Sequence, residues 1–185
     1  SELEKVREDI KRLIEDLRRA NDRVRRESER LNRELREVNK RVHDDNRRLI
    51  EELRRLVKDI KDKETVRRIV DEVLKEVRKT VETVKRISKE VLERSRKLIE
   101  EVKEITKRAL EEVEELVRDV ERKTRDERVR DELRKLLRTV EKVVEESKKH
   151  LKEVLDRSRE VVEESKTHLE KSLTDVEKVV REIRT

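Results

Sequence analysis

Three histidines are the residues in this sequence whose side chains are best suited to chemistry. They are His43, His150 and His168. Imidazole can bind a metal ion, transfer a proton or change its charge near neutral pH. His150 and His168 lie 18 residues apart, so on a helix of 3.6 residues per turn they share one face. A zinc site needs about four ligands, and no thiol or further acid accompanies these histidines. We therefore expect no metal site.

Serine, histidine and carboxylate residues do not combine into a catalytic set. A serine nucleophile needs a base, an oxyanion hole and a pocket that excludes water, whereas the serines here recur along regular helical patterns. The paired Asp44 and Asp45 are adjacent and point in different directions. The sequence has no Cys and no Gly, which excludes thiolate nucleophiles and glycine-rich phosphate loops. We expect neither an enzyme nor a bound cofactor.

The composition also bears on partners. Of 185 residues, 56% are charged and 31% hydrophobic, and the net charge is +6. Basic and acidic residues are interleaved, whereas a nucleic-acid-binding protein gathers Lys and Arg on one face. The longest apolar runs are pairs such as Val143 and Val144, too short to span a membrane. We expect no nucleic acid, no membrane and no natural location; the protein should be soluble in the cytoplasm of a recombinant host.

The apolar residues recur at helical spacing and predict the elements that would position these side chains. In each third of the chain they occupy an arc of about 120–140°, and the arc rotates abruptly at residues 61–65 and 121–128. We expect an all-α, up-down-up three-helix bundle, a single domain over residues 1–185. The helices should span about residues 2–61, 65–122 and 126–184, with about 57–60 residues each.

Capping residues support these boundaries. Thr124 followed by Glu127 spells a capping box, and Ser1 followed by Glu4 spells another. Asp62, in the segment 61–65 between the first two helices, is a weaker N-cap candidate. The apolar pattern repeats every 18 residues, as in the series Val66, Val84, Val102 and Val120. Because this period does not drift around an ideal helix, we expect nearly straight helices.

Small polar residues interrupt the apolar stripes. If the chain turns back at residues 61–65 and 121–128, the numbers of two facing residues have a fixed sum. That sum is about 125 between the first and second helices and about 250 between the second and third. The polar residues then fall into four layers, which we expect to be hydrogen-bonded and to specify helix register and pairing. The layers contain Asn21, Thr106 and Ser147; Ser28, Asn32, Ser95 and Ser158; Asn39, Ser88 and Ser165; and Asn46, Thr80 and Ser172.

The histidines lie at the margins of the same stripes. The same rule places His168 beside His43 and places His150 near Asn21. We expect them to extend the hydrogen-bonded layers. In the alternative interpretation they respond to pH: if they are buried in the neutral form, acid should destabilise the bundle.

Together these features resemble de novo designed helical bundles with buried hydrogen-bond networks. The resemblance covers the whole chain and depends on the 18-residue period, the aliphatic core and the layers around Asn21, Asn32, Asn39 and Asn46. It implies a structural scaffold, monomeric and without a natural activity or a required partner. The alternative is a helical module that self-associates, for example by domain swapping, or binds a partner helix.

Overall fold

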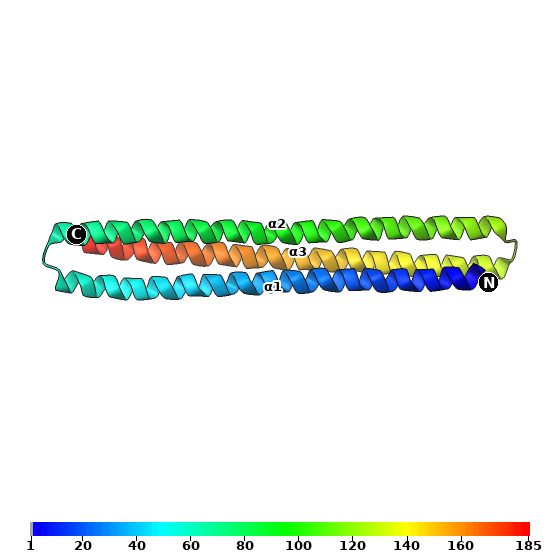
Figure 1. Cartoon of the computed structure of the whole chain (residues 1–185), viewed down its shortest axis with the longest axis horizontal. Coiled ribbons are helices and arrows are strands. Elements are labelled where there is room, and N and C mark those ends of the chain that lie inside the picture. The colour runs from blue at the N-terminus through cyan, green and yellow to red at the C-terminus, as the bar shows by residue number, and fades with distance from the viewer. Residues whose placement is uncertain (1) are drawn as a thin grey trace. The chain divides into compact units, whose positions relative to one another are not determined.

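The computed structural model describes residues 2–185, and these form three α-helices and no strand. The helices are α1 (Glu2–Asp59), α2 (Lys63–Lys123) and α3 (Glu127–Arg184) (Figure 1). The observed bounds differ from the expected ones by two residues at the first turn and by one at the second. The chain is therefore an all-α three-helix bundle, as the apolar spacing predicted.

The chain consists of two compact units, and each unit contains a segment of every helix. Unit 1 comprises Ser1–Glu29 and Arg94–Arg157, and unit 2 comprises Arg30–Glu93 and Ser158–Thr185. Within each unit the segments of α1 and α3 run in the same direction, and the α2 segment runs against both (Figure 1). The single domain expected over residues 1–185 stays a prediction.

Each unit has a core of aliphatic side chains from all three helices. In unit 1, Leu133 is fully buried and packs in a cluster with Ile10 and Val113. In unit 2, the fully buried Val70, Val81 and Val176 belong to a corresponding cluster. These side chains leave water together, and each fully buried Val, Leu or Ile contributes about 1.5–3 kcal/mol. Aliphatic burial therefore holds the helices together and positions the polar residues between them.

Asp62 caps the N-terminus of α2, as its position in the sequence suggested. Its Oδ1 accepts the backbone N–H of Glu64 at 3.2 Å, and its Oδ2 accepts the hydroxyl of Thr65 at 2.7 Å. These bonds stabilise the carboxylate and hold the pKa of Asp62 below its ordinary value, the Thr65 hydroxyl contributing most. The carboxylate also lies at the positive end of the helix dipole.

Replacing Asp62 with alanine should lower stability at neutral pH but make little difference in strong acid. A carboxyl whose pKa is depressed by folding contributes stability above its unfolded-chain pKa, about 3.9, and loses it as the pH falls through the lower folded value. Urea unfolding of Asp62→Ala and the parent protein at several pH values measures the difference. A difference that did not shrink below about pH 3 would contradict this assignment.

The second turn begins α3 differently from the expected capping box. The N-cap is Asp126: its Oδ1 accepts the backbone N–H of Arg128 at 3.0 Å, and its carbonyl accepts that of Arg130 at 3.2 Å. Thr124, the expected N-cap, instead accepts the N–H of Asp126 at 3.3 Å within the turn. The prediction for Thr124 is wrong because an Asp two residues later caps equally well. The first expected box, at Ser1, lies outside the described residues.

Arg130 closes the C-terminus of α2 without glycine. Helices commonly end at a left-handed glycine, whose following N–H groups bond to the last carbonyls; here no described residue has a positive φ. The half-buried guanidinium of Arg130 donates through Nη2 to the carbonyls of Glu121 at 3.4 Å and Thr124 at 3.3 Å. A side chain from the first turn of α3 therefore satisfies carbonyls at the end of α2.

Candidate functional site: buried polar layers

The first polar layer joins α1 to α3 in unit 1 through an asparagine and a serine. Asn21 is half-buried and Ser147 is buried. The Nδ2 of Asn21 donates to the Oγ of Ser147 at 2.8 Å, and that Oγ donates back to the Oδ1 of Asn21 at 3.0 Å. Both polar atoms of the amide are thus paired with one hydroxyl on the other helix.

The same pairing occurs in unit 2. The Nδ2 of Asn46 donates to the Oγ of Ser172 at 2.7 Å, and both residues are buried. The two asparagine–serine pairs have the same sequence separation, 126 residues, which is a whole number of 18-residue periods. Each unit therefore contains the same hydrogen-bonded match between α1 and α3.

Two serine pairs connect α2 to its neighbours. Ser28 and Ser95 lie 3.4 Å apart between α1 and α2 in unit 1, and Ser88 and Ser165 lie 3.0 Å apart between α2 and α3 in unit 2. The hydroxyl of Ser88 also donates to the carbonyl of Val84 at 2.9 Å. Since a serine has one hydroxyl hydrogen, Ser165 must be the donor in its pair with Ser88.

Two threonines depart from the expected layers. Thr106 is buried, but its hydroxyl donates to the carbonyl of Val102 on its own helix at 2.7 Å. Thr80 is exposed and bonds likewise to the carbonyl of Glu76 at 3.0 Å. The expectation that Thr80 joins a buried layer is wrong. Thr80 lies at the edge of the apolar arc, two 18-residue periods before Leu116, which is itself 37% exposed.

The expected pairing of every asparagine with hydroxyls is also wrong at two positions. The Oδ1 atoms of Asn32 and Asn39 are buried and have no hydrogen-bond partner. Ser165 lines the same pocket as Asn39, and its single hydroxyl hydrogen is donated to Ser88. Such an unpaired buried acceptor costs about 1–3 kcal/mol. Ser158, expected in the layer of Asn32, is fully buried.

The histidines lie outside the core. His43 and His168 are exposed and line one pocket of about 340 Å³ between α1 and α3 in unit 2, together with Asn39 and Ser165. His150 is half-buried. The predicted loss of stability in acid required buried histidines, and the exposure of His43 and His168 contradicts that condition. Among residues 2–185 the structure contains no cluster of three or more potential metal ligands.

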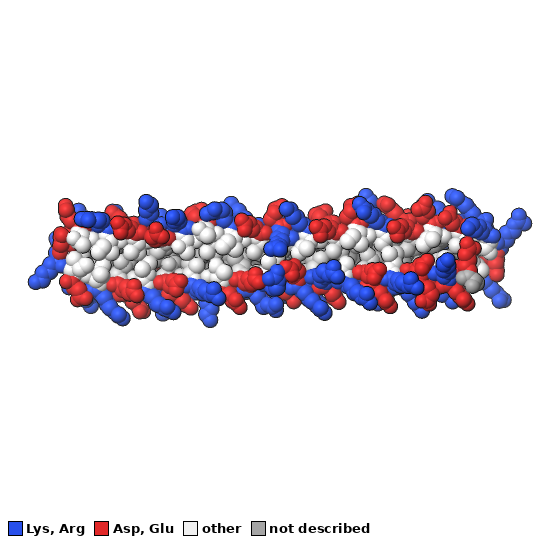
Figure 2. All heavy atoms as spheres, viewed as in Figure 1, with Lys and Arg blue, Asp and Glu red and all other residues white. Residues whose placement is uncertain are grey.

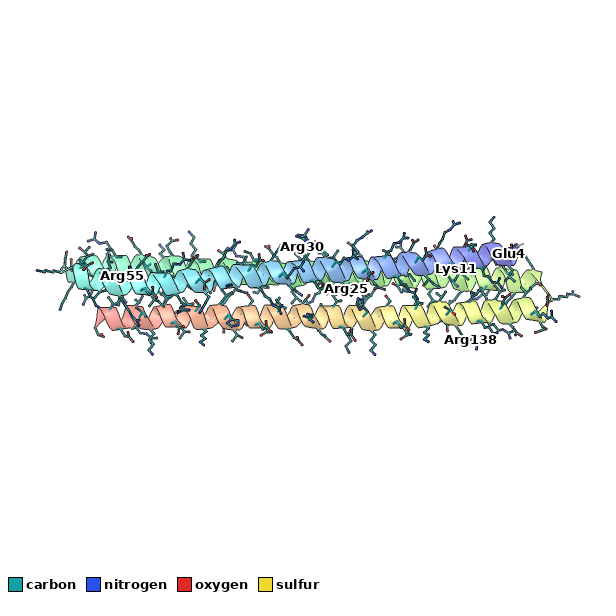
Figure 3. All side chains as sticks on the ribbon, turned by 90° about the horizontal axis from the view of Figure 1, so that it is seen from below. Glu4, Lys11, Arg25, Arg30, Arg55 and Arg138 are labelled. Atoms are coloured by element: carbon teal, nitrogen blue, oxygen red, sulfur yellow. The ribbon has the colours of Figure 1, made fainter. Side chains whose placement is uncertain are left out.

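Charged side chains of both signs surround the layers. Figure 2 shows Lys and Arg alternating with Asp and Glu along α1 and α2, with uncharged residues between these helices, and Arg138 on α3 points away from α1 and α2 (Figure 3). Some ion pairs join helices, as Arg36 and Glu164 do at 3.8 Å between α1 and α3. Exposed pairs contribute about 0–1 kcal/mol each, so these ion pairs add little to the stability of the bundle.

None of the helices in the described part of the chain is both long enough and apolar enough to cross a membrane.

Comparison with known proteins supports the fold. No protein-family model matches the sequence, and the search of curated proteins found no match. Among solved structures, the chain is similar to one described as a computationally designed three-helix bundle, with a TM-score of 0.64 and 18% sequence identity. The alignment covers 99% of this chain and 92% of that one. At this identity, the similarity concerns the fold.

Proposed function

We propose that the protein is a designed structural scaffold without catalytic activity, whose buried polar layers specify how its helices pair. One observation carries this proposal: Asn21–Ser147 and Asn46–Ser172 are hydrogen-bonded pairs with the same separation of 126 residues. A shift of α3 along α1 by four residues, about one turn, would place Val143 or Leu151 opposite Asn21 and leave that amide without a partner. A lost pairing costs about 1–3 kcal/mol, so the layers penalise one-turn shifts.

The similarity to a designed three-helix bundle supports the same proposal. So does the combination of an aliphatic core with small polar groups that bond between helices, which design practice uses to specify one structure. A purely aliphatic helix interface discriminates poorly between registers, and a buried polar pair specifies one of them. In this scaffold the asparagine–serine pairs therefore distinguish one register from the others.

Spin labels across α1 and α3 should test the register directly. Arg36 and Glu164 face each other in unit 2, so labels at Arg36→Cys and Glu164→Cys report the alignment of the two helices. We expect one narrow distance in the parent background. We expect additional distances, about 5 Å or more apart along the axis, once Asn21 and Asn46 become Leu and Ser147 and Ser172 become Ala.

The control keeps the asparagine–serine pairs and removes a hydroxyl that bonds only within its helix. Thr106→Val fits this purpose, because Thr106 is buried and bonds to Val102 of α2. Labels in this background should give the parent distance. A single unchanged distance in the variant without asparagine–serine pairs would show that aliphatic packing alone sets the register.

Self-association is the second candidate function, favoured by two exposed apolar residues. Ile105 is 52% exposed and Leu116 37% exposed, both on α2 in unit 1. We expect a monomer, since two residues provide little apolar area for a stable interface. Light scattering should give a mass near 22.6 kDa. A multiple of that mass, reduced by Ile105→Lys and Leu116→Lys, would favour the self-associating module instead.

A further inference from the structure

A groove between α2 and α3 in unit 1 has an apolar floor. Its volume is about 600 Å³. Leu110 of α2 is half-buried and lines it, and Val144 and Leu151 of α3 lie beneath it, 2% and 0% exposed. Pockets of about 300–1,000 Å³ are typical of small-molecule sites, so the groove is large enough to cover a short aliphatic chain.

Two hydroxyl residues also line this groove, but their hydrogens are already donated elsewhere. Thr106 donates to the carbonyl of Val102 at 2.7 Å, and Ser147 donates to the Oδ1 of Asn21 at 3.0 Å. Neither hydroxyl therefore retains a hydrogen for a ligand. The floor favours hydrocarbon over a polar group.

Lysines dominate the rim of the groove. Lys103 and Lys107 lie on α2, and Lys148 and Lys152 lie on α3, with Glu104 as the one acidic lining residue. The lysines on each helix are four residues apart, which places them on one face. Lysine carries its ammonium on a flexible apolar stem, so its methylenes can cover a hydrocarbon while its charge meets an anion in water.

This excess of basic over acidic lining residues is larger than at the other two pockets. A second groove, in unit 2 between α1 and α3, is lined by three basic and three acidic residues. Two of the four rim lysines form ion pairs with glutamates of their own helices. Lys103 pairs with Glu100 at 3.5 Å, and Lys148 pairs with Glu145 at 3.7 Å. The unit 2 groove therefore provides a charge-balanced comparison.

We propose that the lysine-rimmed groove of unit 1 binds a small anionic amphiphile, an alkyl carboxylate. The alkyl chain lies along Leu110 and the methylene stems of the rim lysines, above the buried Val144 and Leu151, and the carboxylate meets the lysine ammonium groups. Both parts of the ligand are needed, because exposed charges alone attract weakly in water. This site does not depend on the proposed role of the polar layers.

Titration with decanoate, below its micelle-forming concentration, tests the proposal. Amide shifts of the intact protein should map to residues 103–110 and 144–152 and should saturate. Decanol and decyltrimethylammonium have the same chain without the negative charge, and we expect both to bind at least about tenfold more weakly. Equal affinity for the three ligands, or shifts spread over both units, would overturn the proposal.

Charge reversal at the rim gives a second, independent readout. Lys107→Glu with Lys152→Glu should weaken decanoate binding by about tenfold or more. The matched control is Arg54→Glu with Lys178→Glu, which makes the same charge change at the groove of unit 2 and should leave affinity within about twofold. Helical content by circular dichroism should stay at the parent level in both. Equal weakening by the two pairs would mean that net charge alone attracts the ligand, and the groove would not be its site.

Discussion

Replacing Leu133 with alanine is expected to lower the free energy of unfolding by about 2–5 kcal/mol. Leu133 is fully buried in unit 1, where Ile10, Val113 and Val140 belong to the same aliphatic cluster. Alanine would remove three carbon atoms and leave a cavity that long, regular helices close poorly. Urea unfolding followed by circular dichroism measures the change as a shift in midpoint at constant slope.

Leu116→Ala is the matched control for this substitution. It makes the same chemical change in the same unit, but Leu116 is 37% exposed. Its truncation removes less buried area and opens no closed cavity, so we expect a loss of about 1 kcal/mol or less. Similar losses at Leu133 and Leu116 would contradict the assignment of Leu133 to the buried core of unit 1.

The helices and their alignment were predictable from the sequence for a simple physical reason. A helix in a bundle buries one apolar face. The apolar residues of that face recur about every 3.6 residues, so the sequence shows where each helix continues. The interruption of this pattern at residues 61–65 and 121–128 located the turns to within two residues. Folding the chain at these two turns then placed Asn21 level with Ser147 and Asn46 level with Ser172, and both pairs are hydrogen-bonded.

The individual hydrogen bonds were less predictable. The sequence gives the position of a residue along the axis of a neighbouring helix only to about one turn, whereas a hydrogen bond requires donor and acceptor atoms about 3 Å apart. A serine or threonine on a helix can also donate to the carbonyl four residues before it. Thr106 does so and makes no bond to another helix within the described chain. Ser88 does so as well, so Ser165 is the donor in the pair that these two serines form. Such competition depends on rotamers and not on spacing.

The capping role of Arg130 was not predicted from the sequence. Its guanidinium crosses the second turn to reach the carbonyls of Glu121 and Thr124, a contact that depends on how α2 and α3 meet. One signal was available: a chain without glycine must satisfy its terminal carbonyls by other donors. A long basic side chain in the first turn after a short connection is a candidate for that task.

Ser172→Ala is expected to lower the free energy of unfolding by about 1–3 kcal/mol, more than Asn46→Leu. Alanine at 172 leaves the buried Asn46 without the hydroxyl that accepts its Nδ2 hydrogen. Leucine at 46 leaves Ser172, whose hydroxyl can turn to the carbonyl four residues before it, as that of Ser88 does to Val84. Thr106→Val, which removes a hydroxyl bonded within its own helix, is the control and should cost about 1 kcal/mol or less.

The double variant Asn46→Leu with Ser172→Ala separates stability from specificity. Removing both partners leaves no unpaired group, so its unfolding free energy should equal or exceed that of the parent protein. The difference from the sum of the single changes gives the coupling energy, expected at about 1–2 kcal/mol. If the double variant were instead as unstable as Ser172→Ala, the pair would stabilise the fold outright. A gain in stability together with a second helix register would show that the pair lowers stability in return for one defined alignment of α1 with α3.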